Sequence, residues 1–288
     1  MLARMTRSAP IQPVPASAGP APLAPPLPLA GRRVVVTRAQ DQADSLSRLL
    51  QQQGAQVLEL PCVKIVPPSR REPLIEALAG LGCYDWMVFT SANGVTAFFD
   101  SFFKAFEDLR DLGGARFAAV GPATAARLSA LHLKVDLVPR EHTAQAIARE
   151  LAACGSLENT RLLLLRAEVA TPELPALLEH LGAIVDDVPC YRTVAETELG
   201  RAVASDLAAN GADWITFTSG STVTHFHARL NLPELKRRFP RLRLASLGPE
   251  TTQALVALGL NPDVEATPHT LPGLVTALVS SAAAPPGP

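Results

Sequence analysis

The chain has 288 residues, with 26 lysines and arginines against 27 aspartates and glutamates, and a net charge of −1. This balance excludes a bulk electrostatic attraction to nucleic acid or to an anionic membrane surface. Apolar residues make up 48 % of the sequence, so the length and composition predict two domains, each with its own core. The four cysteines show no Cys-x-x-Cys spacing, and we expect reduced thiols in a cytoplasmic protein.

Both ends of the chain differ in composition from its middle. Prolines recur every few positions between Ser8 and Pro28 and interrupt each apolar run that could serve a signal peptide. Residues 1–30 are therefore predicted to be a disordered, polyproline-like tail, and residues 281–288 a second disordered tail. No run approaches the roughly 18 apolar residues of a membrane span.

The middle of the chain alternates predicted strands with predicted helices. Residues 34–36 are a β-branched run typical of a buried parallel strand, and helical spacing follows up to Gly54. Further strands are predicted at residues 86–89, 117–120, 135–138 and 162–165, with helical patterns between them. This alternation predicts an α/β fold with doubly wound parallel sheets.

The second half of this pattern repeats the first. Residues 84–98 and 212–226 share Asp-Trp, Phe-Thr-Ser and Val-Thr at an offset of 128. Arg38-Ala39 and Pro61-Cys62 return at the same offset as Arg166-Ala167 and Pro189-Cys190. A constant register indicates a duplicated unit, and two units of this size predict a pair of flavodoxin-like domains rather than a solenoid.

Two extended, proline-bearing segments occupy equivalent places in the repeat, at residues 61–67 and 189–194. A proline inside a long extended segment favours an edge strand or a linker. We predict that these segments form a two-stranded β linker. Residues 31–62 with 195–280 would then make a discontinuous first domain, and residues 68–188 the second.

Hydroxyl residues follow several of the predicted strands, at the end where ligands bind in open α/β sheets. They are Thr37, Thr90, Ser91, Thr124, Thr218, Ser219 and Thr251. Each can be a helix N-cap and nothing more, yet the same helix N-termini offer free N–H groups to carboxylates or phosphates. Arg38 and Arg166 end equivalent strands and suit carboxylate recognition, the alternative being solvated surface arginines.

The repeat loses its symmetry at Tyr191, which stands where the first copy has Val63. A phenol there could donate a proton to a leaving hydroxyl, whereas a half-buried structural tyrosine is the alternative. The sequence has no Walker loop, dinucleotide glycine motif or nucleophile elbow. His225 and His227 would point to different faces of a helix, so no metal site and no cofactor are predicted.

Six motifs in register resemble the uroporphyrinogen-III synthase family. They are Val-Val-Thr-Arg, Phe-Thr-Ser-Ala-Asn-Gly-Val, Val-Gly-Pro-Ala-Thr, Pro-Cys-Tyr-Arg-Thr-Val, Phe-Thr-Ser-Gly-Ser-Thr-Val and Leu-Gly-Pro-Glu-Thr-Thr. The resemblance implies two flavodoxin-like domains joined by a two-stranded ladder, and an enzyme that needs no cofactor. The implied substrate is hydroxymethylbilane, a linear tetrapyrrole with eight carboxylates, which hydroxymethylbilane synthase would deliver. The implied reaction removes the terminal hydroxyl as water, inverts the last pyrrole ring and closes the macrocycle.

The same resemblance implies roles for individual residues. Tyr191 would assist departure of the hydroxyl, while the protein holds the chain so that the substituted ring carbon attacks. The residues implied to bind carboxylates or pyrroles are Ser91, Ser219, Thr124, Thr251 and Arg38. Two other classes stay open at this point. A non-catalytic two-lobed binding or regulatory module could use the same hydroxyls, and a nucleotide-sugar transferase would need a diphosphate-binding turn. We expect a monomer.

Overall fold

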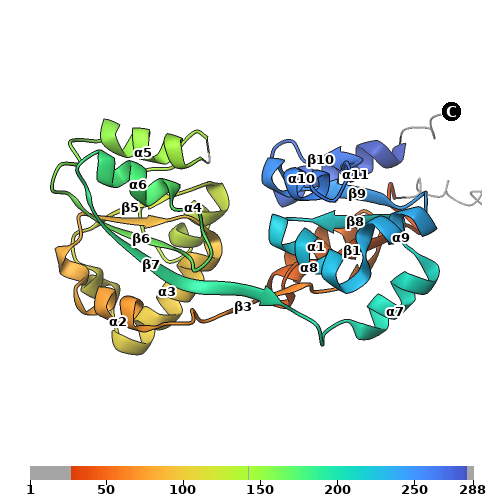
Figure 1. Cartoon of the computed structure of the whole chain (residues 1–288), viewed down its shortest axis with the longest axis horizontal. Helices are drawn as coiled ribbons and strands as arrows, with labels where there is room; N and C mark the ends of the chain where they lie inside the picture. The colour runs from red at the N-terminus through yellow and green to blue at the C-terminus, as the bar shows by residue number, and fades with distance from the viewer. Residues whose placement is uncertain (1–26, 142, 284–288) are drawn as a thin grey trace, which may run out of the picture.

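The computed structural model describes residues 27–141 and 143–283, which Figure 1 shows as two lobes. Most of the two predicted tails, residues 1–26 and 284–288, lies outside the described residues. The prediction of disorder is wrong for residues 27–30, because Leu29 is fully buried and its N–H donates to the carbonyl of Gln53. It is also wrong at Ser281, which belongs to a helix and accepts a hydrogen bond from Arg243.

The first sheet has five parallel strands and includes segments from both ends of the described chain. Its strands, in spatial order, are β10 (Val264–Glu265), β9 (Arg243–Ser246), β8 (Trp214–Phe217), β1 (Arg33–Val36) and β2 (Gln56–Glu59). Read from β2 and numbered along the chain, this order is 2-1-3-4-5. β8 is buried at every position, which is the pattern of a parallel strand covered on both faces.

The second sheet has four parallel strands and one antiparallel strand. Its strands, in spatial order, are β3 (Val63–Val66), β7 (Ile184–Ala195), β6 (Arg161–Ala167), β4 (Trp86–Phe89) and β5 (Arg116–Ala119). The strand predicted at 135–138 is wrong, since Leu137 makes only an isolated bridge with Ala118. This segment lies at the sheet edge, where the Asp136 carboxylate accepts a hydrogen bond from the N–H of Phe117.

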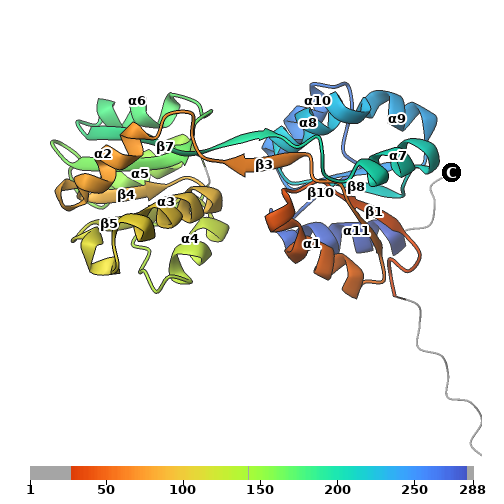
Figure 2. The same ribbon diagram turned by 90° about the horizontal axis from the view of Figure 1, so that it is seen from below.

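Helices cover both faces of each sheet (Figure 2), so the α/β fold with two mostly parallel sheets is confirmed. In the first lobe they are α1 (Gln40–Gln52), α7 (Arg201–Asn210), α8 (Gly220–Leu230), α9 (Leu232–Arg238), α10 (Pro249–Val256) and α11 (Leu271–Ala283). In the second lobe they are α2 (Glu72–Ala79), α3 (Ala92–Ala105), α4 (Pro122–Ser129), α5 (Ala144–Ala153) and α6 (Glu173–His180). Each sheet thus has an apolar core on either side.

Two strands connect the lobes, and they pair with each other. β3 runs antiparallel to the last part of β7, from Val63 opposite Ala195 to Val66 opposite Arg192. β7 is one continuous strand of 12 residues that begins in the second sheet and ends in this ladder. Because β7 is parallel to β6 and β4, the carboxyl ends of those strands point toward the first lobe, as Figure 1 shows.

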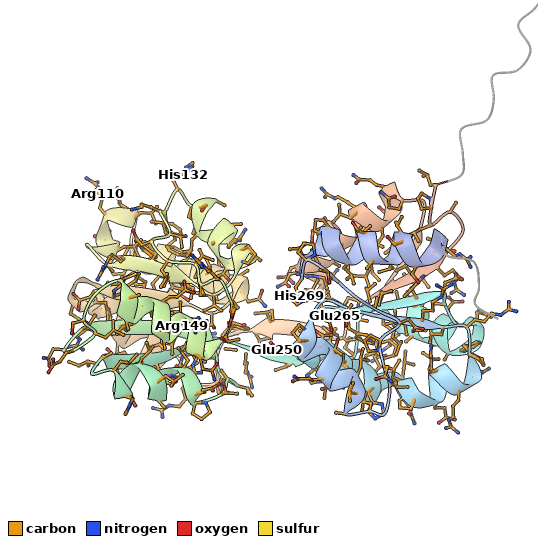
Figure 3. All side chains as sticks on the ribbon, turned by 90° about the horizontal axis from the view of Figure 1, so that it is seen from above. Arg110, His132, Arg149, Glu250, Glu265 and His269 are labelled. Carbon is orange, nitrogen blue, oxygen red and sulfur yellow. The ribbon has the colours of Figure 1, made fainter. Side chains whose placement is uncertain are left out.

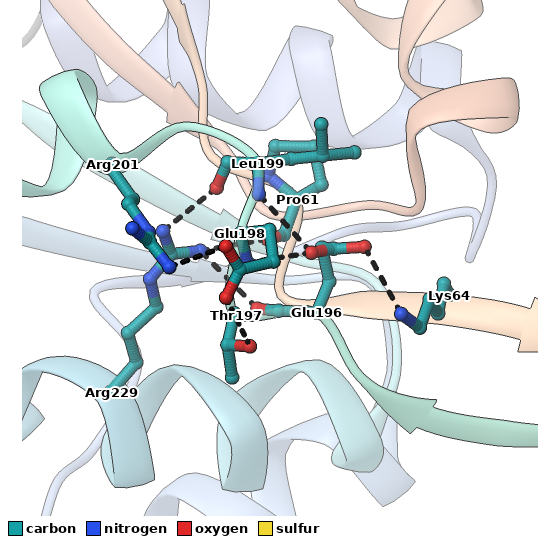
Figure 4. Close-up of polar contacts among 8 residues, drawn as sticks. All are labelled: Pro61, Lys64, Glu196, Thr197, Glu198, Leu199, Arg201 and Arg229. Carbon is teal, nitrogen blue, oxygen red and sulfur yellow. Dashed lines mark hydrogen bonds and ion pairs between the residues drawn. The ribbon is translucent and has the colours of Figure 1, made fainter.

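The ladder is fastened to the first lobe by a polar cluster (Figure 4). The guanidinium of Arg229 donates to the carbonyls of Pro61, Glu196 and Leu199 at 3.1, 3.3 and 2.7 Å. The buried carboxylate of Glu196 accepts the N–H groups of Glu198 and Leu199 at 2.7 and 3.1 Å. These contacts fix the chain where it leaves β7, so the ladder enters the first lobe at one defined position.

We expect this cluster to make stability depend on acid pH. The N–H groups of Leu199 and Glu198 hold the pKa of the Glu196 carboxyl below its ordinary value of 4.5. Since the folded-state pKa is lowered, the carboxylate stabilises the fold above about pH 4.5 and loses this effect as the pH falls further. Glu196→Gln should cost about 1 kcal/mol in urea unfolding at neutral pH. That difference should shrink toward pH 3, and a pH-independent difference would contradict the assignment.

Candidate functional site

The carboxyl ends of both sheets meet between the lobes. Strands β1 and β8 end there on one side and β4 on the other, each followed by the first turn of a helix. The amide Nε2 of Gln42, on α1, donates to Oδ1 of Asn93, on α3, at 2.5 Å. We call these strand ends and the first turns of α1, α3 and α8 the interlobe site.

The structure brings Tyr191 and Ser91 together in the interlobe site. The Tyr191 hydroxyl lies 2.9 Å from Oγ of Ser91, which caps α3 by accepting the N–H of Gly94 at 3.1 Å. A side chain at Gly94 would place its Cβ 3.3 Å from the carbonyl oxygen of Leu165, so glycine allows α3 to approach the end of β6. Thr90, which precedes Ser91, donates its N–H to the carbonyl of Leu165 and is partly exposed.

The surroundings of Tyr191 keep its phenol in the protonated form. Burial raises the pKa of this hydroxyl above its ordinary value of 10, and only 7 % of the residue is exposed. The hydroxyl hydrogen bond with Ser91 opposes this shift without cancelling it. Because Ser91 Oγ already accepts from Gly94, it can donate its own proton to the Tyr191 oxygen. The Tyr191 proton is then free for a third group.

Arg38 supplies a cation at the end of β1. Its Nη2 donates to Oε1 of Gln42 at 3.0 Å, and burial lowers the pKa of its guanidinium. Its Nε is buried and has no hydrogen-bond partner among residues 27–141 and 143–283. A buried donor without an acceptor is costly, and a carboxylate is the acceptor that a guanidinium fits best. Arg38 is thus suited to the role implied for it.

Three of the predicted hydroxyl residues, Thr37, Thr124 and Thr251, are buried. Thr37 is fully buried and donates to the carbonyl of Thr216 at 2.8 Å, which ties β1 to β8. Thr124 and Thr251 hold equivalent positions in α4 and α10, and each is 3 % exposed. The Thr124 hydroxyl donates to the carbonyl of Val120. Thr37 and Thr124 thus use their hydroxyls within the protein.

Thr218 and Ser219 are better exposed, at the end of β8. Ser219 caps α8 through Thr222, whose N–H lies 3.4 Å from the serine oxygen. Its hydroxyl also lies 3.0 Å from that of Ser221. The first turn of α8 therefore presents several hydroxyl groups beside β1, next to Arg38 in the order of the sheet.

Arg166 does not have the environment that its equivalence to Arg38 predicts. Its side chain is 10 % exposed and forms a two-pronged pair with Asp187, with a further hydrogen bond to the carbonyl of Thr171. All three contacts lie within the second lobe. The guanidinium is thus neutralised by its own domain, and its geometry supports a structural role.

We expect Arg166→Met to lower stability by about 1–3 kcal/mol, because it leaves the partly exposed Asp187 without its partner. Urea unfolding measures this loss, and the substrate KM of the variant should change less than twofold. Arg48→Met removes an exposed pair with Asp44 and should stay within about 0.5 kcal/mol of the parent. A large rise in KM for Arg166→Met with unchanged stability would instead support the predicted role of Arg166 in binding the substrate.

The sequence analysis missed several polar residues near the site. Gln42 lies in the first turn of α1, four residues after Arg38, and nothing in the sequence joins Gln42 to Asn93. Figure 3 shows Glu250, Glu265 and His269 on the side of the first lobe that faces the second. His269 Nε2 lies 3.6 Å from the Glu265 carboxylate.

A cavity of about 610 Å³ lies beside the site, between α2, α3 and β3. Its lining is largely apolar and contains Tyr191 but none of the predicted hydroxyl residues. Within residues 27–141 and 143–283, no cluster of His, Cys, Asp and Glu could hold a metal ion. In the same part of the chain, none of the helices has the length and hydropathy to span a membrane.

Comparisons with known proteins agree with this arrangement. A sequence model described as uroporphyrinogen-III synthase HemD matches residues 44–276. The uroporphyrinogen-III synthase of Synechococcus elongatus is 32 % identical over 255 residues, covering 87 % of this chain and 96 % of the relative. A porphyrin biosynthesis protein HemD of Ruminiclostridium josui is also 32 % identical, and the match covers 70 % of this chain and 40 % of that protein.

Solved structures show the same fold at lower identity. A mutant uroporphyrinogen III synthase of Thermus thermophilus is 20 % identical, with a TM-score of 0.60, and covers 87 % of this chain and 98 % of that one. The synthetase of Helicobacter pylori is 18 % identical, with a TM-score of 0.57, and covers 87 % and 99 %. The family match extends over most of the chain, and the relative from Synechococcus elongatus is matched over nearly its full length. The chain belongs to the uroporphyrinogen-III synthase family and is an enzyme of porphyrin synthesis.

Proposed function

We propose that the protein is a cyclising lyase that converts hydroxymethylbilane to uroporphyrinogen III in the interlobe site. The observation that carries this proposal is the pairing of Tyr191 with Ser91 in a member of this family. A protonated phenol can donate to a leaving hydroxyl, and Arg38 can bind a carboxylate of the same substrate.

The chemistry demands little covalent help from the protein. The Tyr191 proton joins the departing hydroxyl to form water, while the ring nitrogen supplies electrons and leaves an electron-poor azafulvene. The substituted carbon of the last ring then attacks this centre and forms a spiro intermediate. The older bond from this carbon to its methylene bridge breaks, which restores the last pyrrole and leaves a second azafulvene on the third ring, and the free carbon of the inverted ring attacks that bridge. Loss of the proton from this carbon makes the last pyrrole aromatic again, and the proton returns to Tyr191. Without guidance the chain closes with no inversion, so the main task is to hold the reacting carbons in place.

We also infer that the two lobes are flavodoxin-like domains from one duplicated unit. The order 2-1-3-4-5 of the first sheet is the flavodoxin-like order. An offset of 127 or 128 takes β1 and β2 to β6 and the first part of β7, and takes β4 and β5 to β8 and β9. In this proposal residues 31–62 with 195–280 and residues 68–188 are the domains, and the β3–β7 ladder is their linker.

The remaining parts of the proposal concern supply and assembly. The substrate bears eight carboxylates and closes spontaneously, so we propose direct supply by hydroxymethylbilane synthase. We propose that a monomer is sufficient for the reaction, because Arg38, Ser91 and Tyr191 all come from one chain.

The test is to incubate the purified protein with freshly generated hydroxymethylbilane and to separate the porphyrin isomers after oxidation. We expect mainly type III, with type I, the product of spontaneous closure, in the sample without protein. A folded protein that yields only type I would overturn the proposed reaction and favour a two-lobed binding module.

A further inference from the structure

The hydrogen bond between Gln42 and Asn93 joins the two lobes. Apart from the β3–β7 ladder and its anchor, it is the one side-chain hydrogen bond that joins the lobes within residues 27–141 and 143–283. It lies in the first turns of α1 and α3, directly after the strand ends that carry Arg38 and Ser91. The rest of the interlobe link is the ladder of the two strands β3 and β7.

The amide pair is oriented from both sides. Arg38 Nη2 donates to Oε1 of Gln42, which leaves the Gln42 amide nitrogen to donate to Asn93. On the other side, Asn93 stands two residues after Ser91, and its side chain helps to lower the pKa of the Tyr191 hydroxyl against the effect of burial. A row of polar side chains thus extends from Arg38, on the first lobe, through the Gln42–Asn93 hydrogen bond toward Tyr191, at the end of the second lobe.

We propose that Gln42 and Asn93 form a clasp that sets the spacing of the lobes, and that they are positioning residues for ring closure. The clasp holds the carboxylate-binding Arg38 at a fixed distance from the proton donor Tyr191, although neither amide takes part in the chemistry. A substrate carboxylate that binds Nε and Nη2 of Arg38 together would displace the Gln42 oxygen from Nη2, and it would thus compete with the contact that orients the clasp. Binding of the substrate and the position of the lobes are thereby coupled. This inference rests on the proposed function for its kinetic consequences, whereas the spacing of the lobes is a property of the free protein.

The test uses the full chain in four variants, Gln42→Ala, Asn93→Ala, the double alanine variant, and the exchange Gln42→Asn with Asn93→Gln. The exchange keeps both amides and the summed length of the two side chains. Gln51→Ala, an exposed position on the same helix, is the matched control. Small-angle X-ray scattering of the free proteins reports the spacing of the lobes, and isomer analysis reports kcat, KM and the fraction of type III.

We expect each single alanine variant to broaden the distribution of interatomic distances and to lower kcat/KM about fivefold, the effect of one hydrogen bond. The double variant should lose no more than either single variant, because both remove the same contact. The exchange should recover most of the loss, and Gln51→Ala should match the parent. Scattering curves equal to that of the parent for both single variants, or losses that multiply in the double variant, would overturn the clasp. If the parent makes no type III isomer, the proposed function fails while the scattering comparison still decides on the clasp.

Discussion

We expect Tyr191→Phe to lower kcat about 100-fold, at the lower end of the range for loss of a general acid. We expect the loss of kcat to lie at the lower end of this range because the pyrrole nitrogen already drives departure of the hydroxyl. The variant keeps the ring and loses only the group that lies 2.9 Å from Ser91, so substrate binding should change little. Turnover at saturating substrate measures the effect.

The chain contains a matched control for this change, since Tyr84 is its only other tyrosine. The Tyr84 hydroxyl donates to Asp186 at 2.6 Å, away from the interlobe site. Tyr84→Phe should retain kcat within about twofold. At equal concentration, Tyr191→Phe should yield more type I isomer, because spontaneous closure competes with a slower enzyme, and raising its concentration should restore type III. A wild-type rate in Tyr191→Phe would show that the phenol takes no part in the reaction.

The largest loss of stability is expected for Phe98→Ala. Phe98 is fully buried in α3 and packs against Phe89, Phe99 and Phe102 with ring centroids 5.6, 5.2 and 6.2 Å apart. Truncation of such a side chain leaves a cavity and costs about 3–5 kcal/mol. Urea unfolding should show this loss in the transition of the second lobe, because the cluster belongs to the core of that lobe.

Phe103→Ala provides the comparison, because Phe103 lies on the same helix and is 48 % exposed. Its truncation removes little buried surface and should cost less than about 1 kcal/mol. Equal losses for the two variants would contradict the placement of Phe98 at the centre of the cluster. α3 also carries Ser91 at its first turn, so Phe98→Ala should lower activity at temperatures where the second lobe begins to unfold.

Local patterns in the sequence predicted the α/β fold and the central strands. Residues 86–89 are an apolar run between turn residues, and residues 214–217 repeat it with one threonine. Such runs are typical of parallel strands that are covered on both faces. The edge of the second sheet could not be predicted in this way. Val135 and Leu137 have suitable side chains, but strand formation there depends on a neighbour that is supplied only by the fold.

The candidate site, like the fold, could be predicted from the sequence only in part. Ser91 and Tyr191 were singled out by position and by broken symmetry, and the structure places their hydroxyls together. Arg166 was expected to resemble Arg38 because the two end equivalent strands, yet Asp187 on the neighbouring strand neutralises it. Contacts between distant segments, such as Gln42 with Asn93, leave no periodic signal in a single sequence. Residue type and local spacing therefore predicted which residues lie at the strand ends. Which of their side chains are free to bind a ligand could be seen only in the structure.

The central claim is that the substrate binds between the two carboxyl edges, in contact with both lobes. Hydrogen–deuterium exchange of the protein with and without bound uroporphyrinogen III tests this claim directly. We predict slower exchange in the first turns of α1 and α3 together, around Gln42 and Asn93, and in β7 next to Tyr191. Protection confined to one lobe, or to the apolar cavity between α2 and α3, would contradict it.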